Sequence, residues 1–285
     1  MTSVGVAVVT HNGMQWIDQC LQSILEQTSP ADRIVVVDDA STDGTWEHLQ
    51  GNYASEIELL AAPRSEPSRP LSARIAANFV YAVHHCDTEL VALSDQDDRW
   101  LPTRLDQQVA RIGSAAMIAH DGFLIDESGG RLPGHLRRWF PVPDDFQQVD
   151  PARRFRYALH YSLATGGASM LRPRRFASLA VPAGWLHDRW WSLVATAMDA
   201  MVVDPVCVLE YRVSAGQVIG LDRGLQAGSP LQRIAGGLGR SSSLARLTAL
   251  HRLRSWDGVA PEVAALLRWP QLLHAVMTKP DSGGA

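Results

Sequence analysis

The first hundred residues alternate short apolar runs with longer segments whose apolar residues recur at helical spacing. We expect the apolar runs to be buried strands; they are Val4–Thr10, Ile34–Val37, Ile57–Ala61 and Leu90–Leu93. We expect the intervening segments to be helices; they cover residues 16–27, 44–53 and 71–83. Strands joined by helical crossovers run parallel and place helices on both faces of the sheet. The alternation therefore predicts an α/β fold with a doubly wound, mostly parallel sheet flanked by helices.

Polar residues follow three of the expected strands at the point where each strand ends. Thr10 ends the first strand, Asp38 and Asp39 follow the second, and the run 95–98 follows the fourth. The carboxyl ends of parallel strands lie along one edge, and open α/β sheets bind their ligands there. The sequence therefore predicts a strongly acidic ligand site at this edge.

Asp95 and Asp97 are two residues apart, so in an extended chain they would point to the same side. Neighbouring carboxylates repel each other unless a cation lies between them, and oxygen-rich sites suit Mg²⁺ or Mn²⁺. A solvated acidic turn after a strand is the alternative, and it needs no metal. A bound cation would reverse the local field and allow an anionic diphosphate to approach. Neutral donors, such as ribose hydroxyls or a base N–H, could also bind the aspartates directly.

Several common nucleotide-binding motifs are absent from the sequence. Residues 10–13 read Thr-His-Asn-Gly, so no Gly-x-Gly-x-x-Gly fingerprint follows the first strand, and no P-loop occurs. The segment 43–45, Asp-Gly-Thr, is similar to a phosphatase loop, but the nucleophile position holds Ser41. A calcium loop over the same stretch would need an acidic residue where Gln50 stands.

Four segments together resemble the family 2 glycosyltransferases of the GT-A fold. They are Val-Val-Thr-His-Asn-Gly at 8–13, Val-Val-Val-Asp-Asp-Ala-Ser-Thr-Asp-Gly-Thr at 35–45, Ala-Asn-Phe at 77–79 and Leu-Ser-Asp-Gln-Asp-Asp-Arg-Trp at 93–100. The last two are most similar to bacterial rhamnosyltransferase-like members, which build surface polysaccharides. The resemblance covers about residues 4–220.

This resemblance implies an inverting transfer of a sugar from a nucleotide-diphosphate donor, a dTDP- or UDP-sugar, to an acceptor hydroxyl on a glycan or a lipid-linked acceptor. It also implies a divalent cation, Mg²⁺ or Mn²⁺. By motif match, Thr10 and Asp39 would bind the nucleotide, Asp95 the ribose and the metal, and Asp97 the metal. Arg74 stands where family members often place an arginine near the donor.

Asp188 is the candidate catalytic residue of the second half of the chain. It follows His187 and precedes a segment at helical spacing, 191–198, so we expect it in the first turn of a helix. An aspartate there often caps the helix or stabilises its dipole, which would explain Asp188 without chemistry. In the resembled family an aspartate in this context is the general base that takes the proton of the acceptor hydroxyl. His187 could orient Asp188, line the acceptor pocket or simply pack.

Three further residues are acceptor-site candidates. Trp139 belongs to a basic and aromatic cluster, 137–140, within a stretch, 130–151, that we expect to be irregular. The cluster is either a surface loop or a flap whose rings stack on sugars. Gly166 and Gly167 allow close backbone approach, to a sugar or to a neighbouring element.

Ser214 departs from the resembled pattern. It lies where family members usually have a histidine that completes the metal site, and a hydroxyl is a poorer ligand than imidazole. Metal affinity would then be weaker, or diphosphate and water would fill the position, or catalysis would be lost. A nucleotide-sugar or glycan-binding module without catalysis is therefore an alternative function. A sugar-1-phosphate nucleotidylyltransferase is a second, although residues 10–13 lack the glycine-rich, basic first loop of that class.

We expect the glycosyltransferase domain to cover residues 1–220, with a nucleotide-sugar half, 1–115, and an acceptor half, 116–220. Residues 221–285 would form a linker or lid and then a C-terminal helical extension. In the acceptor half and the extension, we expect two strands and two helices, at Met117–His120, Phe123–Ile125, Leu244–Trp256 and Pro261–Thr278. The apolar face of the C-terminal helices would pack on the domain, form a homodimer or, with nearby arginines, contact a membrane surface.

Composition narrows the partners and the compartment. The net charge of −4 gives no reason to expect nucleic acid as a partner. Three scattered cysteines suit a reducing compartment rather than a disulfide framework. The sequence shows no signal peptide and no apolar run of the roughly 20 residues that span a membrane. We therefore expect a cytoplasmic protein, or one peripheral to the inner face of the membrane.

Overall fold

The computed structural model describes residues 2–63, 70–214 and 240–280. Its single sheet has nine strands, with the order β3-β2-β1-β4-β8-β6-β9-β5 and β7 paired to β6. The strands are β1 (Val4–Thr10), β2 (Arg33–Asp38), β3 (Glu58–Ala61), β4 (Leu90–Asp95), β5 (Arg99–Trp100), β6 (Met117–Ile125), β7 (Arg131–His135), β8 (Ser169–Leu171) and β9 (Met201–Arg212). The helices are α1 (Ile17–Leu25), α2 (Thr45–Asn52), α3 (Leu71–Cys86), α4 (Arg104–Ile112), α5 (Pro151–His160), α6 (His187–Ala197), α9 (Arg240–Leu253), α10 (Pro261–Leu266) and α11 (Trp269–Met277). Short 3₁₀ helices are η1 (Leu136–Arg138), η2 (Gly166–Ala168) and η3 (Pro173–Arg175).

The N-terminal half is the predicted parallel sheet. β1 pairs in parallel with β2 and β4, and β2 pairs in parallel with β3. Beyond β4 the direction changes, because β8 runs antiparallel to both β4 and β6, whereas β6 and β9 are parallel to each other. The expected doubly wound, mostly parallel α/β fold is confirmed.

Helices cover both faces of the sheet, and the side chains of β1 show how. Val6 and Val8 point into one core, which α1, α2 and α4 complete. Ala7 points into the other core, which α3, α5, α6 and the C-terminal helices complete. Alternate residues of a central strand therefore meet apolar side chains on opposite faces, which explains the continuous apolar runs in the sequence.

The acceptor half differs from the expected elements in two places. Residues 117–125 form the single strand β6, with shifts in its register against β9 near Asp121, instead of two strands. Residues 120–122 misled the sequence interpretation, because pairing with β9 carries the strand through them. The stretch 130–151, expected to be irregular, contains β7 and η1.

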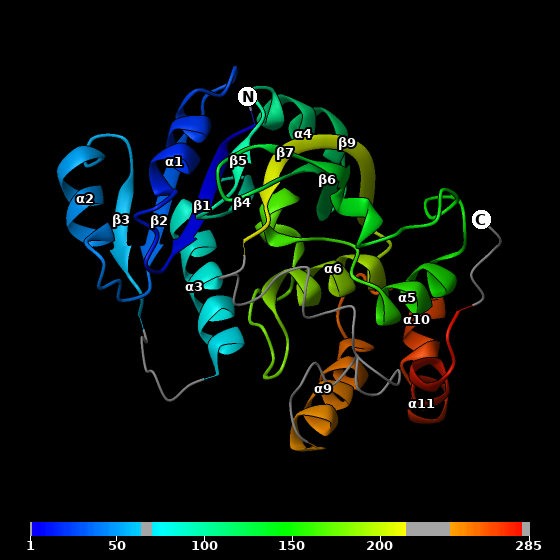
Figure 1. Ribbon diagram of the computed structural model, residues 1–285. Helices are drawn as coiled ribbons and strands as arrows, with labels where there is room; N and C mark the ends of the chain where they lie inside the picture. The colour runs from blue at the N-terminus through cyan, green and yellow to red at the C-terminus, as the bar shows by residue number, and fades with distance from the viewer. Residues whose placement is uncertain (1, 64–69, 215–239, 281–285) are drawn as a thin grey trace.

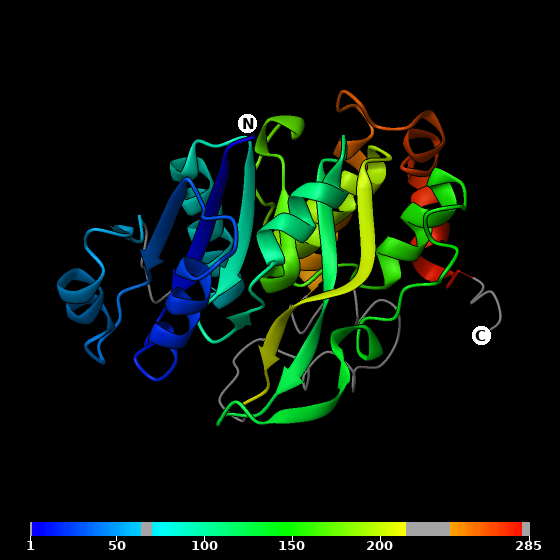
Figure 2. The same ribbon diagram turned by 90° about the horizontal axis from the view of Figure 1, so that it is seen from above.

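The C-terminal helices pack against the main domain. The expected helix over 261–278 is two helices, because Arg268 is extended and Pro270 lies in the first turn of α11. Leu272, Ala275 and Val276 are buried in the main core. Figures 1 and 2 both show α10 and α11 beside α5, at the end of the molecule away from α2 and β3.

The expected linker or lid, 221–242, lies mostly outside the described residues. In the described part of the chain, no helix combines the length and the apolar character needed to cross a bilayer.

Candidate active site

The acidic edge lies where β4 ends. The strand stops at Asp95, and Gln96 and Asp97 form a turn before β5. The expectation that an extended backbone places Asp95 and Asp97 on one side was therefore wrong. The two carboxylates are nevertheless close enough to interact, because Asp97 contributes to the raised pKa of Asp95.

Asp95 and Asp98 are both costly to ionise in this protein. Desolvation raises the pKa of Asp95 to about 7, with further increases from Asp97 and Asp188. Burial, together with Asp97 and Asp95, raises the pKa of Asp98 well above its ordinary value. Asp98 Oδ1 accepts a hydrogen bond from the backbone N–H of Arg212 at 3.1 Å. Its Oδ2 is buried with no hydrogen-bond partner among the described residues.

These carboxylates fit a divalent cation. Crowded carboxylates in a desolvated place favour either protonation or a bound metal, and oxygen ligands suit Mg²⁺ or Mn²⁺. The unpartnered Oδ2 of Asp98 is a further acceptor at this edge. The motif match assigned the metal to Asp95 and Asp97 and left out Asp98, which the structure buries just after the turn 96–97.

The turn η2 connects the acidic edge to Asp188. The backbone N–H of Gly166 donates to Asp188 Oδ2 at 3.1 Å, and the N–H of Gly167 donates to Asp95. A Cβ on Gly167 would lie 2.3 Å from Asp98 Oδ2 and 3.1 Å from Asp95 Oδ2. Gly167 is therefore required for close approach to these carboxylates, whereas at Gly166 a Cβ would lie 2.9 Å from Nε2 of His187. In both cases the close neighbour is another part of the protein, one of the two roles expected for the glycines.

Asp188 lies in the first turn of α6, as expected, but it is not the N-cap. Leu186 is the N-cap residue, and its side chain makes no capping hydrogen bond. The Asp188 carboxylate instead accepts from the N–H of Gly166 and, through Oδ1, from the N–H of Arg189 at 2.6 Å. Its role in catalysis stays a prediction, and its position faces the carboxylates of the acidic edge.

His187 packs inside the core beside Asp188. Its ring stacks on Phe79, with centroids 3.9 Å apart, and meets Trp191 edge-on at 5.4 Å. Neither ring nitrogen has a hydrogen-bond partner in the described parts of the chain. Burial lowers the pKa of His187 to about 4, so the ring is neutral at physiological pH.

The donor-side candidates lie along the same edge. Arg74 Nη2 donates to Asp39 Oδ2 at 2.7 Å, and both side chains are largely buried. Thr10 Oγ1 donates to Gln96 Oε1 at 2.7 Å. The same oxygen accepts from the N–H of His11 at 2.6 Å, so Gln96 links the ends of β1 and β4. Gln96 was not predicted, because its partners are far away in the sequence.

Two buried arginines were also not predicted. Arg104 donates to the carbonyl oxygen of Leu93 at 2.8 Å, and burial lowers its pKa to about 9. Arg212 donates to the carbonyl oxygen of Asp97 at 2.8 Å. Their positive charges lie behind the acidic edge and favour the ionised aspartates. The available signal was an arginine at one end of an amphipathic or apolar segment, the start of α4 for Arg104 and the end of β9 for Arg212, which is too common to interpret.

The remaining candidates are not placed in contact with this cluster. Trp139 packs against the core that contains α1 and α4, and its indole nitrogen is buried without a hydrogen-bond partner in the described chain. Ser214 is half-buried, two residues after Arg212, whose backbone binds Asp98. Ser214 therefore follows closely after a backbone contact to the acidic edge, and its part in a metal site stays a prediction.

A parallel α/β sheet with an acidic edge at its carboxyl ends, and an aspartate facing that edge from a following helix, defines a GT-A-type glycosyltransferase domain. The family model described as "Glycosyl transferase family 2" matches residues 5–175. The chain belongs to this family.

Relatives and solved structures agree with this assignment. The dTDP-rhamnosyl transferase RfbG of Shigella flexneri is 32% identical over 108 residues, which cover 36% of this chain and 35% of RfbG. The amylovoran biosynthesis glycosyltransferase AmsE of Erwinia amylovora is 27% identical over 138 residues, which cover 48% of this chain and 50% of AmsE. The chain spans about a third to two thirds of the length of the curated relatives it matches.

Two solved structures share the fold. S. aureus TarS 1–349 in complex with UDP has a TM-score of 0.56 at 16% identity, covering 99% of this chain and 74% of TarS. The mannosyltransferase PcManGT from Pyrobaculum calidifontis, in complex with GDP-Man and Mn²⁺, has a TM-score of 0.56 at 19% identity, covering 96% of this chain and 70% of PcManGT. At these identities the similarity establishes the architecture.

Proposed function

We propose that this chain is an inverting, metal-dependent glycosyltransferase that moves a sugar from a nucleotide-diphosphate donor to a hydroxyl of a glycan or lipid-linked acceptor, in the synthesis of a bacterial surface polysaccharide. Family membership and the polysaccharide-related relative AmsE support the reaction class. One observation carries the mechanism: adjacent N–H groups of η2 hold Asp95 and Asp188, so a donor-side and an acceptor-side carboxylate face each other.

The metal would be held by Asp95 and Asp97, with Asp98 behind them. When bound, Mg²⁺ or Mn²⁺ would neutralise the diphosphate of the donor and of the leaving group. Mn²⁺ in the complex of PcManGT supports this choice of ion. The desolvated carboxylates provide the affinity, and the charge of the buried Arg104 behind them partly offsets the cost of ionising Asp95 and Asp98.

The nucleotide would lie along the ends of β1 and β2. Arg74 fixes the Asp39 carboxylate, which can accept from a ribose hydroxyl or a base N–H. Thr10, held by Gln96, borders the same pocket. RfbG, which uses dTDP-rhamnose by its name, and TarS with UDP favour a dTDP- or UDP-sugar as the donor.

Asp188 would act as the general base. Its Oδ2 is oriented by Gly166, so the carboxylate is fixed before the acceptor binds. It would take the proton of the acceptor hydroxyl while that oxygen attacks the anomeric carbon from the face opposite the diphosphate. The acceptor would approach past Gly166, Gly167 and His187, with Trp139 on the flap formed by β7 and η1.

Asp188→Asn tests this proposal. The amide oxygen can still accept from Gly166, so donor binding with Mn²⁺ should stay within about twofold, while transfer should fall by about 10²–10⁴-fold. Asp199→Asn, at a surface turn just after α6, is the matched control and should keep full activity. Calorimetry with UDP- and dTDP-sugars measures binding, and product analysis with a defined acceptor measures transfer. Undiminished turnover in Asp188→Asn would remove Asp188 as the base.

The Ser214 departure supports a second candidate, a nucleotide-sugar or glycan-binding module without catalysis. In that case the donor would bind, yet neither transfer nor slow hydrolysis of any donor in the panel would appear. Ser214→His separates the two functions. If this variant binds Mn²⁺ more tightly and turns over faster than the wild type, the wild-type metal site lacks only this one ligand.

A further inference from the structure

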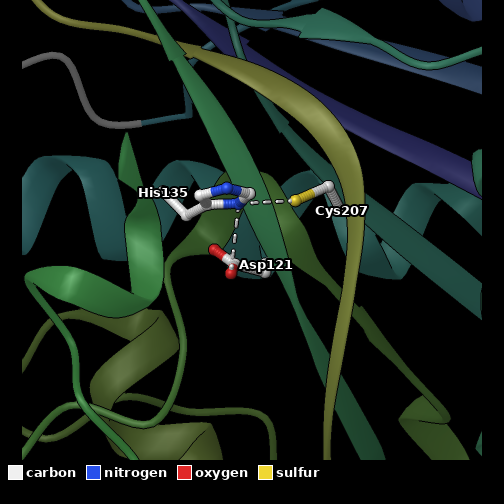
Figure 3. A group of neighbouring side chains, drawn as sticks. All are labelled: Asp121, His135 and Cys207. Carbon is white, nitrogen blue, oxygen red and sulfur yellow. Dashed lines mark hydrogen bonds and ion pairs between the residues drawn. The ribbon is translucent and has the colours of Figure 1, made fainter. Parts of the chain in front are cut away.

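A second group of metal-ligating side chains lies on β6, β7 and β9. Asp121, His135 and Cys207 come from three neighbouring strands and point toward one another (Figure 3). Their ligand atoms all lie within 4.8 Å of one another. His135 Nδ1 is 3.2 Å from Cys207 Sγ and 3.7 Å from Asp121 Oδ2. None of these residues belongs to the acidic edge at Asp95.

Two of the separations, 3.2 and 3.7 Å, are close to those of ligands around one zinc ion, and the third pair of ligand atoms lies within 4.8 Å. Zn–N and Zn–O bonds of about 2.0 Å and a Zn–S bond of about 2.3 Å place tetrahedral ligand atoms roughly 3.3–3.6 Å apart. A hydrogen bond between His135 and Cys207 would explain that pair alone. Asp121 Oδ2 lies at ion-pair distance from the same Nδ1, 3.7 Å, which is too long for a hydrogen bond, so the hydrogen bond does not include the third group.

The backbone and neighbouring rings fix each ligand before any metal binds. Asp121 Oδ1 accepts from the N–H groups of Gly122 and Arg137, at 2.7 and 3.0 Å, which leaves Oδ2 directed at His135. Asp121 and Cys207 are register partners across β6 and β9. The His135 ring packs on Phe123 with centroids 5.1 Å apart.

Nearby positive charges are already occupied. The Arg137 guanidinium donates to the carbonyl oxygens of Leu163, Ala119 and His120. Arg131 pairs with Glu210 at 3.2 Å. A cation at the three ligands would therefore meet a carboxylate whose charge these arginines only partly offset.

We propose that Asp121, His135 and Cys207 form a Zn²⁺ site with three protein ligands and a fourth position open to solvent. A sulfur and an imidazole nitrogen favour zinc over the Mg²⁺ or Mn²⁺ expected at the acidic edge. Binding replaces the proton of the Cys207 thiol, which passes to the buffer. The ion would tie the edge strand β7 to β6 and β9, and so fix η1 and the neighbouring Trp139.

Cobalt titration of the metal-free protein tests the site. Co²⁺ replaces zinc, and a Cys ligand gives a thiolate-to-cobalt charge-transfer absorption that carboxylate ligands do not give. One equivalent should produce this absorption, and Zn²⁺ should abolish it. Cys207→Ser and His135→Ala should lose it, whereas His84→Ala, with an exposed histidine on α3, should keep it. Asp97→Ala should also keep it, which separates this site from the proposed glycosyltransferase metal.

Alkylation of the wild-type protein gives a readout that needs no variant to fold. Cys207 is partly accessible, whereas Cys20 and Cys86 are buried. Zn²⁺ should slow the modification of Cys207 by at least tenfold, as followed by mass spectrometry of its peptide. No charge-transfer absorption in the wild type, an equal absorption in Cys207→Ser, or an unchanged alkylation rate would each overturn the proposal.

Discussion

At Gly167 the backbone passes so close to two carboxylates that the position accepts no side chain. In Gly167→Ala the new Cβ would lie 2.3 Å from Asp98 Oδ2 and 3.1 Å from Asp95 Oδ2. We expect the free energy of unfolding to fall by about 1–3 kcal/mol, since the carboxylates must shift in a packed site. Mn²⁺ affinity, measured by calorimetry, should weaken at least tenfold.

Gly51→Ala is the control for Gly167→Ala. Gly51 lies in α2, and a Cβ there would meet no described atom within 4 Å. Alanine is the better helix former, so this variant should be more stable by about 0.5–1 kcal/mol and bind Mn²⁺ normally. Normal Mn²⁺ affinity in Gly167→Ala would mean that the edge carboxylates do not hold the ion.

Protonation of His187 should make the free energy of unfolding depend on pH, which the sequence does not suggest. Its pKa is lowered to about 4 by burial, from 6.5, so the unfolded chain binds the extra proton between these values and stability is lost as the pH falls. The wild type should lose about 2 kcal/mol of unfolding free energy between pH 7.5 and 5 through this group. His187→Phe keeps the stack on Phe79 but has no group that binds this proton. Its loss of unfolding free energy between the two pH values, measured by urea titration, should be smaller than that of the wild type by this amount. The exposed His84→Phe should behave like the wild type, and equal losses in all three proteins would show that His187 is not buried.

Residue types and motif spacing identify Asp95, Asp97 and Asp188 as candidates, because a local pattern and a resemblance indicate them, and their roles stay predictions. Gln96 and Asp98 could not be assigned in this way. Both lie in the turn after β4, where the side-chain direction depends on contacts with residues such as Thr10 and Arg212. Such contacts between distant segments leave no periodic signal in the sequence.

At the scale of elements, α4 places a buried cation behind the acidic edge. Arg104 lies over the Trp100 ring at 3.6 Å and donates to the carbonyl oxygen of Leu93. Arg104→Met keeps the volume and removes the charge, which should raise the pKa of Asp95 further and lower the free energy of unfolding by about 3 kcal/mol. Chemical denaturation measures the loss.

Arg111→Met, on the same helix, is the control for Arg104→Met. Arg111 is partly exposed and pairs with Asp204 at 3.1 Å, so its removal should cost less than about 1 kcal/mol. If both variants lose the same unfolding free energy, the substitution at Arg104 acts by disturbing the helix and not by removing the buried charge.

The strands that the sequence predicts best are those buried on both faces of the sheet. β1, β2 and β4 are covered on both faces, so continuous apolar runs identify them. β7 is an edge strand with proline and glycine, and β6 carries polar residues at its bulge, so neither follows a simple apolar pattern. The division at residue 220 stays a prediction.

For the whole molecule, the raised pKa of Asp95 couples metal binding to pH. Because the metal-free carboxylate has a pKa of about 7, a proton competes with Mn²⁺ below that pH. Mn²⁺ affinity should fall by up to about tenfold per pH unit below 7 and level off above it. Calorimetric titrations from pH 5.5 to 8.5 measure this, and an affinity that does not change with pH would contradict it.

The same group should affect folding with the opposite sign. The unfolded carboxyl ionises near 3.8 and the folded one near 7, so the folded protein binds the extra proton between these values. The metal-free protein should therefore lose stability from Asp95 as the pH rises through this range, and Mn²⁺ should restore it. Thermal unfolding of the wild type with and without Mn²⁺, at pH 5 and 7.5, shows whether the ion stabilises more at the higher pH.

Adjacent amides in η2 hold one carboxylate from β4 and one from α6. Because the two amides belong to the adjacent residues Gly166 and Gly167, a shift of one carboxylate would pull on the main chain that holds the other. In the proposed reaction, the spacing of these two amides would therefore help to set how far Asp188 lies from the donor side of the site.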